Sequence, residues 1–405
     1  MPRQLTRQLT RHVTLVALLA AVTAIGPFAL QALSPALPAL AGEFRVPAAS
    51  AQLMLSLSLV ATAFATLVWG PVSDRLGRRP MMLAGMVLAA LGSLLAAVAP
   101  ALWLAILARL LQAAGAAAGA VLARAVAQDL YGRERAAGVI GQISAVMVLA
   151  PMLAPVLSGL IVELAGWRGV FALSGLIAAV LVGWCWAALP ETAPRAPAEV
   201  PLATLRGFAE VARVRAFWSH ACFGASALAT FLFFVGAAPY VMQEAFGLGP
   251  AAYGVAFIPL AAAYMLSSTV CGRVTARLGP RRTILLGSAL TIGAMSAGLV
   301  AMALGFDNPL GLMVPAMFHS VGAGLAVPNA VAGAVGAAPA RAGAASGLFG
   351  FLQFMAGAVA AQIAGFVPHG VAAPTVAGMT VFSVLGLAGF LALEGKARSA
   401  PLPHA

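Results

Sequence analysis

Residues 70–85 read GPVSDRLGRRPMMLAG, and residues 272–287 read GRVTARLGPRRTILLG. Eight of the sixteen positions are identical at an offset of 202 residues, about half of the 405-residue chain. In both copies a basic, glycine-containing stretch ends one long apolar segment and leads into the next. A further match, Gly159 with Gly365, occurs at an offset of 206. A sequence that repeats once along its length predicts two halves of similar architecture.

The composition is that of a membrane protein. Apolar residues make up 62% of the chain and charged residues only 8%, whereas soluble domains have about 45–50% and about 25%. Each apolar segment is long enough to cross a bilayer, and backbone groups in lipid must be satisfied within a helix. We therefore expect an all-α membrane protein with twelve transmembrane helices in two pseudo-symmetric six-helix bundles, and a water-soluble enzyme is excluded. The segments are 13–34, 51–69, 80–98, 101–126, 137–163, 169–189, 216–241, 251–271, 283–304, 310–335, 342–367 and 371–393.

The basic residues predict the orientation. Of the 23 lysines and arginines, 19 lie at the two termini and in the even-numbered connections, whereas the odd-numbered connections hold only Arg45 and Arg168. Cytoplasmic loops carry the excess of basic residues, so both termini are predicted to be cytoplasmic. The net charge of +12 is therefore explained by topology and does not indicate a nucleic-acid partner. We expect the protein to be a monomer embedded in the inner membrane of a bacterium.

A proline-rich stretch joins the two halves. It predicts an N-terminal six-helix bundle at 1–189, a cytoplasmic linker at 190–215 and a C-terminal six-helix bundle at 216–405. Within the linker, residues 202–215 are basic and amphipathic, as is typical of a helix lying along a membrane surface.

The loop at 70–80 combines Gly70, Asp74, Arg75, Gly77, Arg78 and Arg79, and it resembles the signature loop of the major facilitator superfamily. The resemblance implies that Asp74 meets the N-terminal end of the eleventh helix on the cytoplasmic side, where a carboxylate is favoured. It also implies that Arg78 pairs with Asp129. Gly77 would let the chain turn tightly. The alternative is a loop that is basic only because it faces the cytoplasm.

Further short motifs are spread along nearly the whole chain: PALP at 35–38, QLMLSL at 52–57, RLLQAAG at 109–115, LARAVAQDL at 122–130, APMLAP at 150–155, SG at 158–159, VPN at 327–329 and AASG at 344–347. Together they resemble the Bcr/CflA family of drug-resistance exporters. The resemblance implies an inner-membrane proton antiporter for drugs such as bicyclomycin and chloramphenicol, and it identifies Pro151, Pro155 and Gly159 as its antiporter motif. Small residues at 115–119 and 343–347 predict close helix packing.

Arg109 lies eight residues into the fourth helix, about 12 Å deep at 1.5 Å per residue. An arginine there costs at least about 2.5–3.5 kcal/mol, so it usually faces a polar cavity and has a function. Gln112 is a neighbour on the same face. The family assigns this arginine a role in proton coupling. The alternative is a structural arginine whose N–H groups are satisfied by carbonyl groups.

The identity of the proton carrier is an open question. The family usually has an aspartate in the first helix, four residues before the first proline of the Pro-x-x-Pro pair, and this chain has Gln31 there. A glutamine cannot carry a proton, and no carboxylate falls at mid-membrane. His319 in the tenth helix is one alternative, although a lone histidine there is more often a packing residue. Asp129, near Arg124, is the other.

Met54, Tyr240, Asn329 and Gln353 are further candidates for lining a cavity, although such residues often only pack helices together. A mostly apolar cavity with few polar anchors suits small amphipathic drugs. The predicted function is therefore drug efflux by proton antiport, with no enzyme activity, no metal and no cofactor other than the proton as coupling ion. The alternative is an exporter or importer of one metabolite on the same fold. A membrane sensor or membrane enzyme would need a soluble domain or a metal-ligand pair, and the sequence offers neither.

Overall fold

The computed structural model describes residues 2–193 and 201–398, so part of the linker predicted at 190–215 lies outside the described residues. The described chain is helical and divides into two compact units. Unit 1 comprises Met1–Val46, Leu53–Glu199 and Pro250–Val255, and unit 2 comprises Pro47–Gln52, Val200–Gly249 and Ala256–Ala405. Each unit thus includes a short segment from the opposite half of the sequence. The main division falls within the predicted linker.

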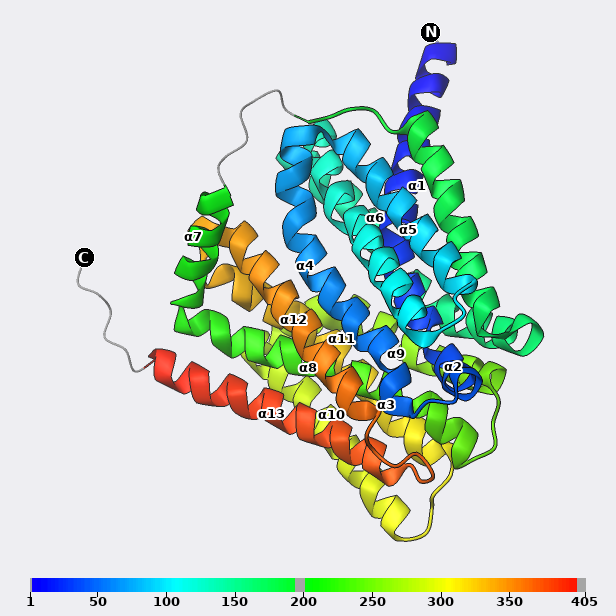
Figure 1. The fold of residues 1–405 in the computed structure, drawn as a ribbon. Coiled ribbons are helices and arrows are strands. Elements are labelled where there is room, and N and C mark those ends of the chain that lie inside the picture. Colours follow the sequence, from blue (N-terminus) through cyan, green and yellow to red (C-terminus); the bar gives the residue numbers. More distant parts are fainter. Residues whose placement is uncertain (1, 194–200, 399–405) are drawn as a thin grey trace. The chain divides into compact units, whose positions relative to one another are not determined.

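Unit 1 is built around one long helical run, α6 (Leu102–Ala188). Gly132 and Gly166 adopt positive φ angles of 68° and 69° and interrupt it, so it consists of three helices. These pack with α1, α4 and α5 (Figure 1). The elements of unit 1 are α1 (Pro2–Ala32), the 3-10 helix η1 (Ser34–Ala36), α2 (Leu37–Phe44), α4 (Leu53–Leu76), α5 (Arg78–Ala97) and α6.

Unit 2 is built around α8, which packs against α11, α12 and α13, while α10 packs against α11 and α13. Its elements are α3 (Ala48–Ala51), α7 (Pro201–Ala212), α8 (Arg215–Glu244), α9 (Pro250–Leu278), α10 (Pro280–Ala303), α11 (Pro309–Gly336), η2 (Pro339–Arg341), α12 (Ala342–Ala364) and α13 (Ala373–Arg398). The first six residues of α9 belong to unit 1. The amphipathic stretch of the linker forms α7, as its pattern indicates.

The described residues contain eleven candidate membrane spans, one of which, Leu149–Ala188, is 40 residues long. At 1.5 Å per residue this segment would measure about 60 Å, twice the roughly 30 Å of a bilayer core. It is interrupted at Gly166 and therefore provides two spans. The spans agree with the predicted all-α fold of twelve helices.

Each unit has its own apolar core. In unit 1 the core is formed mainly by aliphatic side chains and methionines of α1, α5 and α6, including Leu18, Val22 and Met86. In unit 2 it contains Phe217, Phe349 and Phe390. Large apolar side chains such as Leu160 and Leu266 are exposed, which is expected where a helix faces lipid.

The small residues at 115–119 allow close packing, as predicted. A Cβ atom at Gly115 would clash with the backbone of α5 at Gly85, and one at Gly119 would clash with the carbonyl group of Val22 in α1. The second predicted face differs, because a Cβ at Gly343 would meet no atom within 4 Å. The sequence pattern therefore marks a real helix contact in unit 1.

The repeated loop glycines share one conformation. Gly77 has φ 102° and Gly279, its partner at the offset of 202, has φ 79°. Residues other than glycine rarely adopt this positive-φ backbone conformation. Each glycine separates two long helices, α4 from α5 and α9 from α10. The tight turn predicted at Gly77 is confirmed.

Candidate functional site

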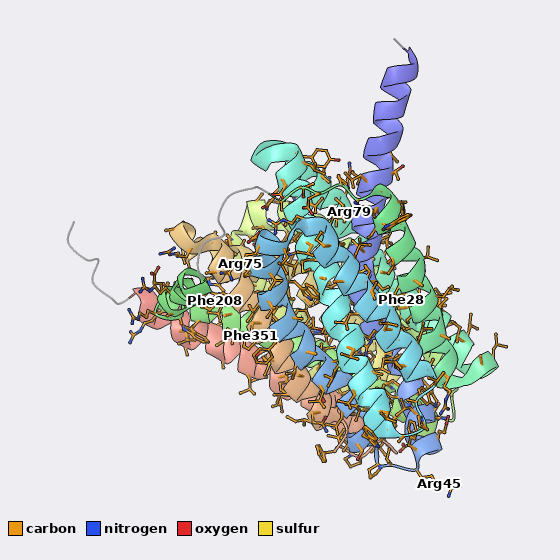
Figure 2. All side chains as sticks on the ribbon, turned by 45° about the horizontal axis from the view of Figure 1, so that its top comes forward. Phe28, Arg45, Arg75, Arg79, Phe208 and Phe351 are labelled. Carbon is orange, nitrogen blue, oxygen red and sulfur yellow. The ribbon has the colours of Figure 1, made fainter. Side chains whose placement is uncertain are left out.

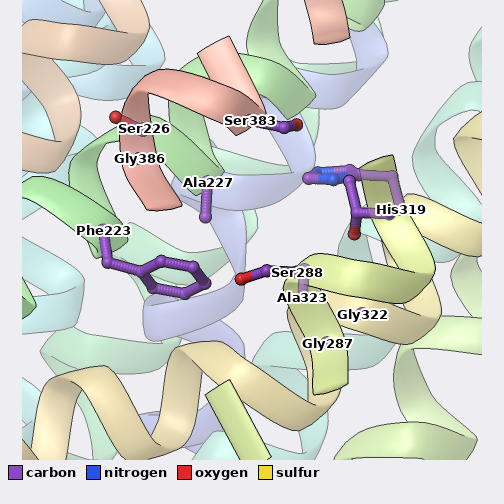
Figure 3. A pocket seen from close by; sticks show the side chains of 11 residues that line it. Phe223, Ser226, Ala227, Gly287, Ser288, His319, Gly322, Ala323, Ser383 and Gly386 are labelled. Atoms are coloured by element: carbon purple, nitrogen blue, oxygen red, sulfur yellow. The ribbon is translucent and has the colours of Figure 1, made fainter. Parts of the chain in front are cut away.

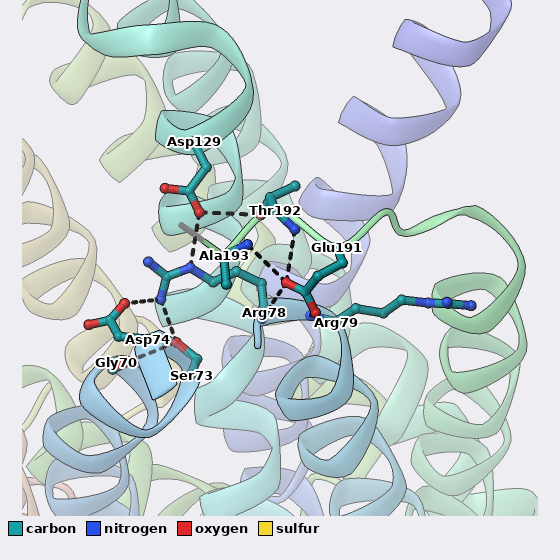
Figure 4. A network of polar contacts seen from close by, with 9 residues as sticks. All are labelled: Gly70, Ser73, Asp74, Arg78, Arg79, Asp129, Glu191, Thr192 and Ala193. Atoms are coloured by element: carbon teal, nitrogen blue, oxygen red, sulfur yellow. Dashed lines mark hydrogen bonds and ion pairs between the residues drawn. The ribbon is translucent and has the colours of Figure 1, made fainter. Parts of the chain in front are cut away.

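The loop between α4 and α5 holds a cluster of charged side chains around Arg78 (Figure 4). Arg78 is buried, and its Nε donates to Asp129 Oδ2 of α6 at 3.0 Å. Its Nη1 contacts Asp74 Oδ1 and the Ser73 hydroxyl oxygen, each at 2.5 Å. One guanidinium therefore joins the end of α4 to α6. The pairing of Arg78 with Asp129 is confirmed, and Asp74, predicted to meet the eleventh helix, forms an ion pair with Arg78 in unit 1.

Glu191, three residues after α6 ends, caps the start of α5. Its Oε1 accepts from the backbone N–H of Arg78 at 2.8 Å, and its Oε2 accepts from that of Arg79 at 3.3 Å. Thr192 and Ala193 also donate their backbone N–H groups to Oε1. Partial burial raises the pKa of the Glu191 carboxyl, but these four donors outweigh it and hold the pKa below its ordinary value. Glu191 is not among the residues predicted from the sequence, because no local pattern links it to Arg78, 113 positions earlier.

The remaining residues of the signature loop lie around this cluster. The carbonyl oxygen of Gly70 accepts a hydrogen bond from the Ser73 hydroxyl group. Arg79 Nη2 donates to the carbonyl group of Trp186 at 2.7 Å. Arg75 is exposed. Figure 2 shows Arg75 and Arg79 toward one end of unit 1 and Arg45 at the other, the separation on which the predicted orientation depends. Arg124, which the sequence places near Asp129, has an exposed side chain.

Arg109 is buried in unit 1 within a chain of hydrogen bonds, with only 2% of its surface exposed. Its Nη1 donates to Gln112 Oε1 at 2.5 Å, and its Nη2 donates to the carbonyl group of Ala29 in α1 at 3.1 Å. Gln112 Nε2 then donates to the Ser93 hydroxyl of α5 at 2.7 Å. Arg109 forms no ion pair with any described residue, and its Nε lacks a partner there. Unit 1 therefore holds a buried positive charge that is hydrogen-bonded but not neutralised.

Gln31 lies two residues after Ala29, whose carbonyl group Arg109 contacts. It is buried, and neither its Oε1 nor its Nε2 has a hydrogen-bond partner among the described residues. A buried amide without partners costs about 1–3 kcal/mol, which is unusual outside a functional site. Met54 is also fully buried. The structure thus brings Arg109, Gln112 and the helix segment that carries Gln31 together in unit 1.

The antiporter motif contacts the first residues of α9. Pro151 and Pro155 lie inside the helix that follows Gly132 without interrupting it. A Cβ at Gly159 would clash with the carbonyl group of Pro250. In the reciprocal contact, a Cβ at Gly254 would clash with the carbonyl group of Pro155. The close helix approach predicted at Gly159 is confirmed, and its partner is the α9 segment that belongs to unit 1.

Three further residues predicted to line a cavity, Asn329, Gln353 and Tyr240, lie in unit 2. Asn329 Nδ2 donates to Thr275 Oγ1 and to the carbonyl group of Leu325, both at 2.9 Å, so this side chain connects α9 with α11. Gln353 Nε2 donates to the carbonyl group of Gly224 at 3.2 Å. Tyr240 is buried and stacks on His369, with ring centroids 4.8 Å apart. Asn329 and Gln353 thus have polar groups engaged in helix packing.

His319 lines a small pocket of about 20 Å³ inside unit 2. The pocket lies among α8, α10, α11 and α13, and Figure 3 shows the His319 ring directed from α11 into the space near Ala227 and Ser383. His319 is 4% exposed, and neither ring nitrogen has a hydrogen-bond partner among the described residues. The other polar residues of the lining are Ser226, Ser288, Thr291 and Ser383.

The helical bundle and the signature-loop geometry define a membrane transporter of the major facilitator type. Residues 19–361 match the Major Facilitator Superfamily, and the chain belongs to this superfamily. The fold is shared with a bacterial homologue of the human lysosomal transporter Spinster, at a TM-score of 0.74 and 15% identity over 97% of this chain and 99% of that one.

Several proteins named for drug resistance are similar to this chain over most of its length. Multidrug resistance protein D of Escherichia coli (strain K12) is 29% identical, with 89% of this chain and 90% of that protein covered. The chloramphenicol resistance protein of Pseudomonas aeruginosa is 28% identical, covering 84% and 81%. The bicyclomycin resistance protein homolog of Haemophilus influenzae is 27% identical, covering 89% and 91%. The predicted kinship with drug-resistance exporters is confirmed, and the chain is a multi-pass membrane transporter and not an enzyme.

Proposed function

We propose that this protein exports small amphipathic drugs from the cytoplasm across a bacterial inner membrane, with inward proton flow as the driving force. The termini and the Arg78 cluster would face the cytoplasm. The observation that carries the proposal is the match, over more than four fifths of the chain, to proteins named for resistance to chloramphenicol, bicyclomycin and multiple drugs. No nucleic-acid partner and no cofactor enter this proposal, and the functional unit is a monomer.

The geometry of unit 1 supports transport. A buried cation that lacks a counter-ion is costly in a membrane, so intramembrane charges usually mark an ion or substrate pathway. Arg109 is such a residue, and the unpartnered amide of Gln31 lies on the adjoining segment of α1. The Gln31 amide offers hydrogen-bond donors and an acceptor in otherwise apolar surroundings, which is the chemistry that holds an amphipathic molecule.

Two measurements test the proposal. In a bacterium lacking its own efflux pumps, expression of this chain should lower susceptibility to chloramphenicol and to structurally unrelated amphipathic drugs. In everted membrane vesicles with an imposed pH gradient, adding chloramphenicol should dissipate part of the gradient. Saturable flux of one metabolite without drug resistance would instead indicate a dedicated metabolite transporter. A gradient that no transported drug dissipates would contradict proton antiport.

A further inference from the structure

The His319 pocket differs from an ordinary packing site because neither ring nitrogen of its histidine makes a hydrogen bond of good geometry among the described residues. Two other described histidines show what packing normally provides. His220 Nδ1 lies 3.0 Å from the carbonyl oxygen of Ala216, and His369 Nε2 lies 3.0 Å from that of Ala364. Neither nitrogen of His319 makes a hydrogen bond of good geometry within the described chain, although the backbone of Ala227 interacts with its ring. Buried polar groups are almost always hydrogen-bonded, so an unpartnered imidazole aimed into a pocket indicates a ligand.

The internal repeat gives His319 a counterpart in unit 1. Gly85 and Gly115 are the closest points of one helix crossing, and Gly287 and Gly322 are those of the equivalent crossing, because a Cβ at either member would clash with its partner helix. Gln112 lies three residues before Gly115, and His319 lies three residues before Gly322. The two side chains therefore occupy matching positions. Gln112 is engaged by Arg109 and Ser93, whereas neither ring nitrogen of His319 makes a hydrogen bond of good geometry with a described residue.

The lining of the pocket favours a proton as this ligand. Ser288 and Ser383 each donate their hydroxyl hydrogen to the carbonyl group four residues earlier, at 2.9 Å. Their oxygen lone pairs can then accept from a donor in the pocket, such as water or a protonated imidazole. A lone histidine without further ligating side chains is a poor metal site. Histidine is also the side chain whose ordinary pKa lies nearest to neutral.

The pocket lining has no charged group that would hold the proton in place. The residues lining it from α8, α10 and α13 include no carboxylate, lysine or arginine. On α8 the titratable neighbours in sequence are His220, which bonds to its own helix, and Cys222, which packs against Gly389 of α13. An adjacent carboxylate would stabilise imidazolium permanently. Here the charge of His319 would instead depend on the access of water to the pocket.

We propose that His319 carries the coupling proton in this chain, which has Gln31 where the family has an aspartate in the first helix. This inference rests on the proposed proton antiport. A lone pair on one ring nitrogen of the neutral imidazole forms an N–H bond with a proton delivered by hydronium, which leaves as water. The reverse transfer to water on the other side of the membrane completes one proton movement per cycle. Gln31 then serves only as a hydrogen-bonding group.

The test uses the full-length protein in proteoliposomes, with chloramphenicol as the probe. His319→Gln keeps a hydrogen-bonding side chain but cannot be protonated, and it mimics Gln112. We expect this variant to retain chloramphenicol counterflow, which needs no gradient, and to lose accumulation driven by a pH gradient. His220→Gln is the matched control and should retain both. Gradient-driven accumulation by His319→Gln with the wild-type pH dependence would overturn the proposal, as would the loss of both activities in a correctly folded variant.

A second measurement separates this proposal from the proposed function. If the wild-type protein shows no chloramphenicol counterflow, drug export fails for that probe, but proton binding can still be tested. The protein labelled with ¹⁵N-histidine is titrated by NMR in detergent, and the imidazole signal missing from His319→Gln is assigned to His319. A signal that titrates reversibly within about pH 5–8 supports the proposal, and one that stays unchanged across that range overturns it.

Discussion

The Glu191 carboxylate accepts a hydrogen bond from the backbone N–H of Arg78 at 2.8 Å, at the point where α5 begins. The first N–H groups of a helix have no partners within the helix, and a carboxylate satisfies them and interacts favourably with the helix dipole. The side chain of the same Arg78 binds Asp129 and Asp74. One residue of the signature loop therefore connects the end of α4, the start of α5, α6 and the first residues of the linker.

Replacing Glu191 by glutamine should destabilise unit 1 in a pH-dependent way. The folded protein holds the pKa of Glu191 below its ordinary value, so its stabilising effect is complete at neutral pH and is lost as pH falls through the lowered pKa. At neutral pH we expect a loss of about 0.5–2 kcal/mol, the usual value of a helix cap. Thermal unfolding of the detergent-purified protein measures it.

The control for this prediction is Glu210→Gln, which removes an exposed ion pair with Arg341. Such pairs contribute about 0–1 kcal/mol, and we expect a small effect. Wild type and Glu191→Gln should converge in melting temperature as the solution is acidified. A difference that stays constant down to acid pH would show that the charge of Glu191 is not what caps α5.

Arg78 and Asp129 should be energetically coupled. In a double-mutant cycle with Arg78→Ala and Asp129→Ala, we expect an interaction energy of about 0.5–3 kcal/mol, because each single variant leaves a charge without its partner. Arg78→Lys should not restore wild-type stability, since a lysine has one nitrogen and cannot contact Asp129 through one atom and Asp74 and Ser73 through another. If the losses in unfolding free energy of the two single variants simply add in the double variant, Arg78 and Asp129 are not coupled.

Arg109→Ala should abolish transport while expression remains intact, because it removes the buried charge and two hydrogen bonds. Each bond to a charged group is worth about 1.5–3 kcal/mol, so a loss of at least about tenfold in flux is expected. Gln112→Leu should also reduce transport, since it removes an acceptor from Arg109 and a donor from Ser93. Drug efflux from whole cells, normalised to the protein in the membrane, measures both. Unchanged efflux for Arg109→Ala would remove it from the site.

Gly159→Ala should destabilise the contact between Gly159 and the first residues of α9. A Cβ there would clash with the carbonyl group of Pro250, and over-packing a helix contact costs about 1–3 kcal/mol. Gly254→Ala should have a similar effect, because its Cβ would clash with Pro155. Gly183→Ala is the control, since its Cβ would meet no atom within 4 Å. If all three variants have the same melting temperature, residues 250–255 do not pack on the antiporter motif as closely as the structure indicates.

Sequence patterns predicted most of the helices and the internal repeat and located Arg109 and Gln112, and the resemblance to the major facilitator superfamily implied the Arg78–Asp129 pair. The predicted segments 80–98 and 310–335 correspond closely to α5 and α11. Positions that depend on distant partners were not accessible in this way. Glu191 stands in a proline-rich stretch that shows no capping pattern, and Ser93 is an ordinary small residue of a span. Asn329 was predicted to line a cavity, but its amide bonds to Thr275 and Leu325.

The sequence by itself determined the class of protein, because spans, their orientation and the repeat follow from where apolar and basic residues lie along the chain. It also named His319 as a candidate, because that residue is a titratable group in an apolar segment. Only the tertiary structure decided which of these polar side chains are satisfied. Gln112 finds partners on its own helix and on α5, whereas His319, at the matching position of the second half, faces a pocket with neither nitrogen bonded. Hydrogen bonding between helices depends on which faces meet, and that is set by packing across residues far apart in the chain.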